Sequence, residues 1–225
     1  KVRKIKILVI NHVPEVDLGS YKEFISSDGH SFEQFYFSSL KKPPSINKYD
    51  ALWVMGGPMN VWEENRYPWL IQEKLFIKNW VLNLEKPFFG ICLGHQLLGE
   101  ALGARVVKSK TPEIGFKKIS LKREVYSNNL FRNFSEDMRV LQGHSAEISN
   151  FSKEKIKVLA SSDSCSIQAL SYLNHAFSVQ FHPEVVDDTI QNWITIPKIK
   201  KDFHDAIGPN AVSYTHLTLP TNGLV

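Results

Sequence analysis

Cysteine is scarce in this chain of 225 residues, which contains only Cys92 and Cys165. Two cysteines cannot build the disulfide framework of a small secreted domain, so a reducing compartment is the simpler expectation. Long apolar runs are absent as well, and the apolar run near the N-terminus is too short for a signal-peptide core or a membrane span. We therefore expect a cytoplasmic protein that does not insert into a membrane.

The chain also lacks a strong excess of charge of either sign, since its formal net charge is only +4. Its lysines are scattered or lie in short runs without interleaved aromatic residues, which favours solvated faces over a nucleic-acid surface. No phosphate-binding glycine loop and no metal-ligand spacing of histidine and cysteine stands out. We therefore expect no nucleic-acid partner, no bound metal and no cofactor.

Strands and helices alternate through the first hundred residues. Apolar runs bounded by glycine or proline indicate buried strands, and apolar residues that recur four apart indicate helices. This alternation predicts a doubly wound, mostly parallel α/β sheet of flavodoxin-like type, with helices on both faces. The expected strands are 5–10, 32–37, 51–55 and 87–91, and the expected helices are 19–27, 69–84 and one that runs from Cys92 to Gly103.

Beyond Gly103 the pattern changes to short strands with little helix between them, which predicts an antiparallel extension of the same sheet. The expected strands are 105–107, 115–122, 138–142, 156–160, 166–173 and 176–181. We then predict a final helix over residues 187–206, or a pair of helices interrupted at Pro197. No linker or repeat divides the chain, so residues 1–210 are expected to form one domain.

Cys92 lies where the strand 87–91 turns sharply into a helix, within a Gly-x-Cys-x-Gly pattern. Glycines on both sides permit a tight, strained turn, as in the nucleophile elbow of serine hydrolases. Amides at the start of a helix favour the thiolate form of such a cysteine. The pattern therefore predicts a nucleophilic thiol, although a lone buried cysteine is more often structural.

A thiolate nucleophile needs a proton-transfer partner that is itself oriented by a third group. His182 follows the alternating strand 176–181, and Pro183 allows Glu184 to fold back towards the imidazole. His95, three residues after Cys92, is the rival base, but it has no carboxylate beside it and its position early in the helix directs it away from the substrate. The pattern favours His182 with Glu184.

Gly56 and Gly57 directly follow the buried strand 51–55. A backbone amide without a neighbouring Cβ can face a reacting carbonyl, so this glycine pair is a suitable place for a donor to an oxyanion. The amide of Leu93, immediately after Cys92, would be the second donor. Most Gly-Gly-Pro triplets are only turns, but this one ends a strand that is expected to neighbour the central one.

Together these motifs resemble the class I, triad-type glutamine amidotransferase domain. The motifs are Gly-Ile-Cys-Leu-Gly-His-Gln at 90–96, the later His-Pro-Glu at 182–184 and the earlier Gly-Gly-Pro at 56–58. The resemblance implies Cys92 as nucleophile, His182 as base and Glu184 as the third member of the triad. It also implies Gly57 and Leu93 as oxyanion donors.

The resemblance further implies a site for the amino-acid head of L-glutamine. Gln96 would help to hold the substrate, and the segment Gln142-Gly143-His144-Ser145 resembles the one that binds the head group in relatives, with Ser145 as the expected contact. His144 and Ser145 are otherwise readily explained as polar residues at a strand end. Residues 113–116 resemble stand-alone members related to the amidotransferase part of GMP synthase.

The expected activity is hydrolysis of the glutamine side-chain amide, with ammonia released to a separate synthetase subunit. Two alternatives stay open at this point. The same triad could act on a γ-glutamyl conjugate, as a γ-glutamyl hydrolase or peptidase, or the chain could be a non-catalytic regulatory subunit. The intact triad argues against the regulatory alternative.

Residues 211–225 are expected to be a non-native read-through tail. Residues 211–221 resemble a translated sequencing-library adaptor, and the tail contains no charged side chain and has no helical period. We predict that deleting 211–225 leaves the melting temperature and glutaminase activity unchanged, because such a tail should add few core contacts. A marked loss of stability would instead indicate a natural C-terminal strand at a sheet edge.

Overall fold

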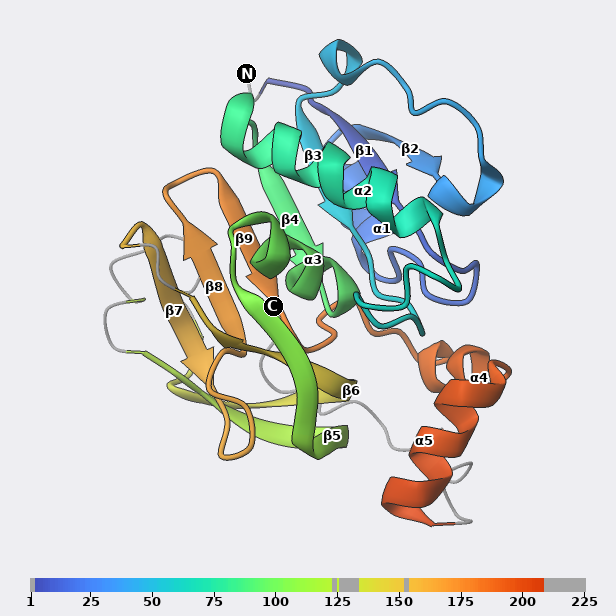
Figure 1. Cartoon of the computed structure of the whole chain (residues 1–225), viewed down its shortest axis with the longest axis vertical. Helices are drawn as coiled ribbons and strands as arrows, with labels where there is room; N and C mark the ends of the chain where they lie inside the picture. Colours follow the sequence, from blue (N-terminus) through green and yellow to red (C-terminus); the bar gives the residue numbers. More distant parts are fainter. Residues whose placement is uncertain (1–2, 123–124, 126–133, 152–153, 209–225) are drawn as a thin grey trace.

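Nine strands form one continuous mixed sheet in the computed structural model of the chain, which describes residues 3–122, 125, 134–151 and 154–208 (Figure 1). The strand order is β2-β1-β3-β4-β9-β8-β7-β5-β6. This arrangement confirms the predicted α/β fold with a doubly wound parallel part and an antiparallel extension. The expected end of the domain at residue 210 and the tail 211–225 lie outside the described residues.

The parallel half of the sheet contains β2 (Ser31–Phe35), β1 (Lys6–Ile10), β3 (Ala51–Val54), β4 (Phe88–Ile91) and β9 (Ala176–Val179). The inner strands are apolar along nearly their whole length because helices cover both faces of this part of the sheet. The strand that ends in Gly56-Gly57 does lie beside the strand that ends in Cys92, as the sequence predicted.

The antiparallel half continues from β9 through β8 (Ala169–Tyr172) and β7 (Ile156–Ser161) to β5 (Arg105–Leu121) and β6 (Asp137–Asn150). β5 joins the two strands predicted at 105–107 and 115–122 into one. A register shift between Lys108 and Glu113 accommodates the intervening Pro112, which cannot donate to the ladder. β6 runs beyond its predicted end at 142 because the first half of β5 pairs with it.

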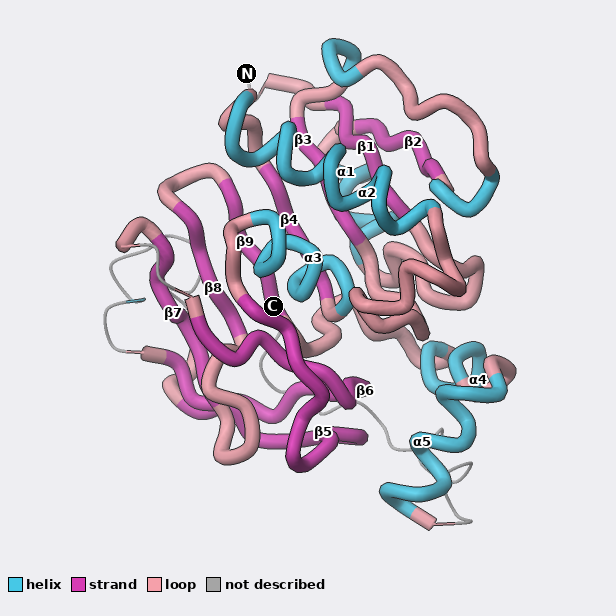
Figure 2. Tube along the Cα trace, viewed as in Figure 1, coloured by secondary structure: helices cyan, strands magenta, loops and turns pink. Residues whose placement is uncertain are grey.

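Helices cover both faces of the parallel half (Figure 2). α1 (Tyr21–Ser27) packs Ile25 into the same apolar cluster as Ile7 and Val9 of β1. α2 (Trp69–Lys78), extended by a π-helical turn (Asn79–Asn83), lies on the opposite face with α3 (Leu93–Ala101). Alternate residues of each strand therefore belong to different clusters, as the two-residue period of a strand requires.

The final segment forms two helices, α4 (Thr189–Trp193) and α5 (Pro197–Ile207), and Pro197 begins the second of them. This outcome confirms the predicted interruption, since proline is tolerated in the first turn of a helix but not in its interior. Phe203 of α5 and Trp193 of α4 are buried in a third apolar cluster with residues of β5 and β6. α5 therefore lies against the antiparallel extension, close to the carboxyl edge of the parallel strands.

Two short 3-10 turns, Phe37–Ser39 and Ile46–Lys48, connect β2 to β3. Within the described part of the chain, none of the helices has the length and apolar character needed to cross a membrane. The carboxyl ends of β1, β3, β4 and β9 meet at one edge of the sheet, which is where ligands bind in folds of this kind.

Candidate active site

Cys92 occupies the strained turn between β4 and α3, with φ 51° and ψ −101°. A side chain in this region of backbone space costs about 1–3 kcal/mol, which the packing around the turn must offset. The two flanking glycines allow that packing. A Cβ added at Gly90 would lie 2.6 Å from the carbonyl oxygen of Gly94, and one added at Gly94 would lie 2.0 Å from that of Val54.

His182 is held beside Cys92 by main-chain and side-chain bonds. Its amide donates to the carbonyl of Leu141 in β6 over 2.9 Å, and its Nδ1 lies 2.6 Å from Oε1 of Glu184. Cys92 lines the same pocket as His182, and its interaction with the ring contributes to the raised pKa of His182. Gly56 lies against both groups, since a Cβ there would be 3.0 Å from His182 Cε1 and 3.6 Å from Cys92 Cβ.

The charge of His182 follows from these neighbours. Burial disfavours the imidazolium, but the carboxylate of Glu184 and negative charge at Cys92 outweigh that effect and raise the pKa of His182 above its usual value. The imidazole therefore holds its proton at neutral pH. The Cys92 side chain, the His182 ring and the Glu184 carboxylate therefore lie in sequence, with the carboxylate orienting the ring.

The amides of Gly57 and Leu93 flank the same space. Within the described part of the chain, neither amide has a hydrogen-bond acceptor. Both residues line the pocket that contains Cys92 and His182. Two unpaired N–H groups beside a nucleophile can bind the oxygen of a tetrahedral intermediate.

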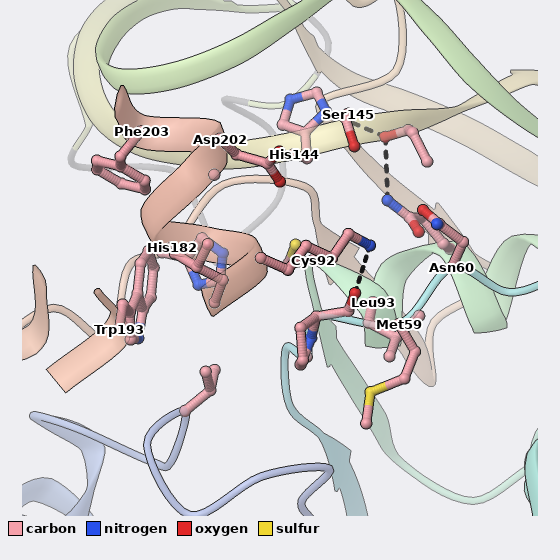
Figure 3. Close-up of a pocket in the computed structure, with 18 residues that line it drawn as sticks. Met59, Asn60, Cys92, Leu93, His144, Ser145, His182, Trp193, Asp202 and Phe203 are labelled. Atoms are coloured by element: carbon pink, nitrogen blue, oxygen red, sulfur yellow. Dashed lines mark hydrogen bonds between the residues drawn. The ribbon is translucent and has the colours of Figure 1, made fainter. Parts of the chain in front are cut away.

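The pocket that contains Cys92 and His182 opens to solvent, and polar side chains from several elements converge on it (Figure 3). The residues proposed from sequence to bind substrate, Gln96, His144 and Ser145, all line it. Gln96 donates from Nε2 to the carbonyl of Ala146 over 3.0 Å and to Oε1 of Gln180 over 3.2 Å. Both N–H groups of this amide therefore donate within the protein, and its oxygen can accept a hydrogen bond from a ligand.

The ring of His144 is engaged by the protein itself. Its Nδ1 donates to the carbonyl of Ala146 over 3.0 Å, and its buried Nε2 lies 3.2 Å from Oε2 of Glu113 without completing a hydrogen bond. Ser145, the next residue in β6, has no such restraint on its hydroxyl within the described chain. The geometry therefore suits Ser145 better than His144 for a direct contact with a substrate.

Sequence reasoning missed the contribution of the last two helices. The ring of Trp193 stands edge-on to His182 with centroids 4.3 Å apart, and it covers the imidazole. Lys198 and Asp202 line the pocket from α5, and Lys198 donates to the carbonyl of Pro58. The four-residue spacing of the apolar Ile199, Phe203 and Ile207 was the available signal that one face of this helix is buried.

His95, the rival base, lies elsewhere. It is fully buried between the hydroxyl of Ser178 at 2.8 Å and the carbonyl of Ile167 at 3.1 Å. Burial without a carboxylate partner lowers the pKa of His95 to about 3, so this ring is neutral. Its bonds tie α3 to the sheet, and it is not among the residues that line the pocket.

Cys165 belongs to a different buried group, in which its sulfur lies within 4.8 Å of ligand atoms of Glu113 and His144. Burial raises the pKa of Cys165 to about 12, so the thiol keeps its proton at neutral pH. Oε2 of Glu113 already accepts bonds from Gln168 at 2.7 Å and Ser162 at 3.0 Å. These hydrogen bonds tie β5 to the segment that connects β7 to β8.

Comparison with known proteins identifies the class to which this fold and site belong. Residues 16–195 match the family "Glutamine amidotransferase class-I". The chain belongs to this family and is a glutamine amidotransferase enzyme, which confirms the resemblance drawn from the three motifs.

Among its relatives are subunits A of glutamine-hydrolysing GMP synthase. The chain is 34% identical to that of Sulfurisphaera tokodaii over 147 residues, which are 64% of this chain and 73% of the relative. It is 31% identical to that of Sulfolobus acidocaldarius over 74% of this chain and 85% of the relative. A crystal structure of a glutamine amidotransferase from Thermotoga maritima matches with a TM-score of 0.83 and 28% identity, covering 95% of this chain and 91% of that one.

Proposed function

We propose that the chain hydrolyses the side-chain amide of L-glutamine through a γ-glutamyl thioester on Cys92 and supplies the ammonia to a separate synthetase subunit. The observation that carries the proposal is the contact of His182 with both Cys92 and Glu184, at a pocket flanked by two unpaired amides. The likeness to GMP synthase subunits A supports both the glutamine substrate and a synthetase partner.

The reaction begins with attack of the Cys92 thiolate on the side-chain carbonyl carbon of glutamine. The amides of Gly57 and Leu93 donate hydrogen bonds to the oxyanion that forms. Donors that are already in position stabilise this developing negative charge and so lower the barrier. The imidazolium of His182 gives its proton to the departing nitrogen as the C–N bond breaks, and ammonia leaves. Water then attacks the thioester carbonyl while His182 accepts a proton from it, and cleavage of the C–S bond releases glutamate and regenerates the thiolate.

The head of the substrate carries one positive and one negative group, and the pocket offers groups of both signs. Among the residues that line it, Lys198 and Asp202 are the charged side chains apart from the histidines. Burial raises the pKa of Asp202, although Lys198 and Lys201 oppose that effect. Asp202 and the oxygen of Gln96 suit an α-ammonium group, and the hydroxyl of Ser145 suits an α-carboxylate.

The proposal is tested by incubating the purified chain with glutamine and, separately, with a γ-glutamyl peptide, and measuring glutamate and ammonia. We expect equal amounts of glutamate and ammonia from glutamine, and little cleavage of the peptide. Preferred cleavage of the peptide would establish the γ-glutamyl hydrolase alternative. Absence of both activities, with Cys92 unreactive towards a glutamine-like electrophile, would favour a regulatory subunit.

A further inference from the structure

A buried pair of side chains, His12 and Glu73, lies behind the peptide that joins Gly56 to Gly57. Nδ1 of His12 is 2.9 Å from the carbonyl oxygen of Gly56, and its Nε2 is 2.8 Å from Oε1 of Glu73. Both side chains are fully shielded from solvent. Neither residue lines the pocket, so the pair does not bind substrate directly.

Few local features of the sequence indicated this pair. His12 falls in the loop after β1, at the same sheet edge as Cys92, and Glu73 falls on α2 three residues after the buried Leu70. A carboxylate on the apolar face of a helix is rare unless it is paired. Its burial is explained by the histidine that it meets.

Both ring nitrogens of His12 face acceptors, which fixes the protons of the pair. The carbonyl of Gly56 and the carboxylate of Glu73 can only accept, so both nitrogens donate and the ring is an imidazolium. Burial disfavours that form, but Glu73 outweighs it and raises the pKa of His12. A buried ion pair of this kind is disrupted at large cost when only one partner is removed.

The bond to Gly56 determines which way the next amide points. The described residues contain no cis peptide, and in a trans peptide the C=O and the following N–H point in opposite directions. Holding the oxygen of Gly56 against His12 therefore turns the N–H of Gly57 to the opposite side, where Gly57 lines the pocket with Cys92 and Leu93. A peptide between two glycines rotates easily, so this orientation needs an anchor.

The side chains of His12 and Leu93 pack so closely against Gly57 that a larger residue would not fit there. A Cβ added at Gly57 would lie 2.8 Å from Cβ of His12 and 3.1 Å from Cδ2 of Leu93. The ring of His12 also stacks on Trp69 of α2, with centroids 6.0 Å apart and planes 29° apart. The imidazole is therefore held in place on one side by α2 and on the other by the strand-end peptide.

We propose that Glu73 and His12 are positioning residues that hold the Gly56–Gly57 peptide so that the N–H of Gly57 faces the oxyanion of the reaction. The inference rests on the proposed function for its consequence in catalysis. It extends the site from the pocket wall into the interface between α2 and the loop after β1.

The test compares two double variants in one background. Glu73→Gln removes the buried negative charge in both. His12→Asn then keeps an N–H donor near the position of Nδ1, whereas His12→Leu supplies similar bulk without a donor. We expect kcat for glutamine to fall about 100-fold in the leucine variant, near the effect of losing one oxyanion donor, and to recover at least about tenfold in the asparagine variant. KM should stay nearly constant.

Two measurements separate this role from a general structural one. Alkylation of Cys92 by iodoacetamide needs the thiolate but no oxyanion donor, so its rate should be the same in both double variants. His175→Leu is the matched control, because His175 also donates to a main-chain carbonyl, that of Val81 over 2.9 Å, far from the pocket. We expect that control to keep kcat and KM. Equal kcat in the two double variants, or slowed alkylation in step with kcat, would overturn the inference.

A third measurement does not depend on the substrate. In ¹H–¹⁵N spectra the amide signal of Gly57 should shift in His12→Leu/Glu73→Gln and stay near its wild-type position in His12→Asn/Glu73→Gln. A wild-type chain that hydrolyses no glutamine would refute the proposed function alone, and the Gly57 signal would still decide the positioning role. The same shift in both variants, or in neither, would refute that role.

Discussion

Cys92→Ala is expected to abolish glutamine hydrolysis, with a fall in kcat of about 10⁴-fold or more. The reason is that the side chain supplies the bond-forming atom, and no other described cysteine reaches the pocket. In the wild type, the glutamine analogue diazo-oxo-norleucine should alkylate the thiolate with loss of nitrogen. Mass spectrometry should find one adduct per chain, located on Cys92.

Cys165 provides the internal control for this experiment. It is 1% exposed and its raised pKa keeps it protonated, so it should remain unlabelled at neutral pH. Cys165→Ala should retain the labelling of Cys92 and the glutaminase activity. Equal labelling of both cysteines, or activity that survives Cys92→Ala, would show that the nucleophile has been assigned wrongly.

His182→Ala is expected to lower kcat by about 10³-fold or more, because the variant loses both the stabilisation of the thiolate and the proton for departing ammonia. Glu184→Gln should have a smaller effect of the same kind. Its amide can still accept from Nδ1 of His182, so the fold and substrate binding should be retained. Full activity of His182→Ala combined with inactivity of His95→Ala would overturn the assignment of the base.

The effect of pH on kcat should also differ between the wild type and Glu184→Gln. Glu184 raises the pKa of His182, so its neutralisation lowers that pKa. Activity that requires the imidazolium is lost as the pH rises through the pKa of the folded enzyme. The alkaline limb of the kcat profile should therefore move to lower pH in Glu184→Gln, whereas a substitution that only loosens the fold would lower the profile without moving this limb.

The roles of the individual residues in catalysis remain predictions, but their arrangement shows why local motifs were informative. The turn at Cys92 depends on neighbours in sequence: Gly90 permits close approach of Gly94, and α3 begins at once. His182 and Glu184 are two residues apart, so the carboxylate reaches the ring through a short loop. Patterns of this length carry their own geometry because few residues separate the groups that interact.

Contacts between distant segments were less accessible to sequence reasoning. Prediction placed two separate strands at 105–107 and 115–122, but pairing with β6 continues on both sides of the register shift and joins them in β5. Trp193 covers His182 only because α4 and α5 fold back over the edge of the sheet. A side chain of this kind has no local signature, since its role depends on a partner in another part of the chain.

The sequence by itself determined the parallel α/β core, the elbow at Cys92 and the order of the three motifs, because strand burial, helical period and tight turns are encoded locally. Only the tertiary structure decided which groups come together at the edge of the sheet. It places Lys198 and Asp202 in the pocket, and it places His12 between Glu73 and the carbonyl of Gly56. These contacts join distant parts of the chain, and Lys198 and Pro58, for example, are 140 positions apart. They depend on the packing of whole helices, which no single stretch of sequence specifies.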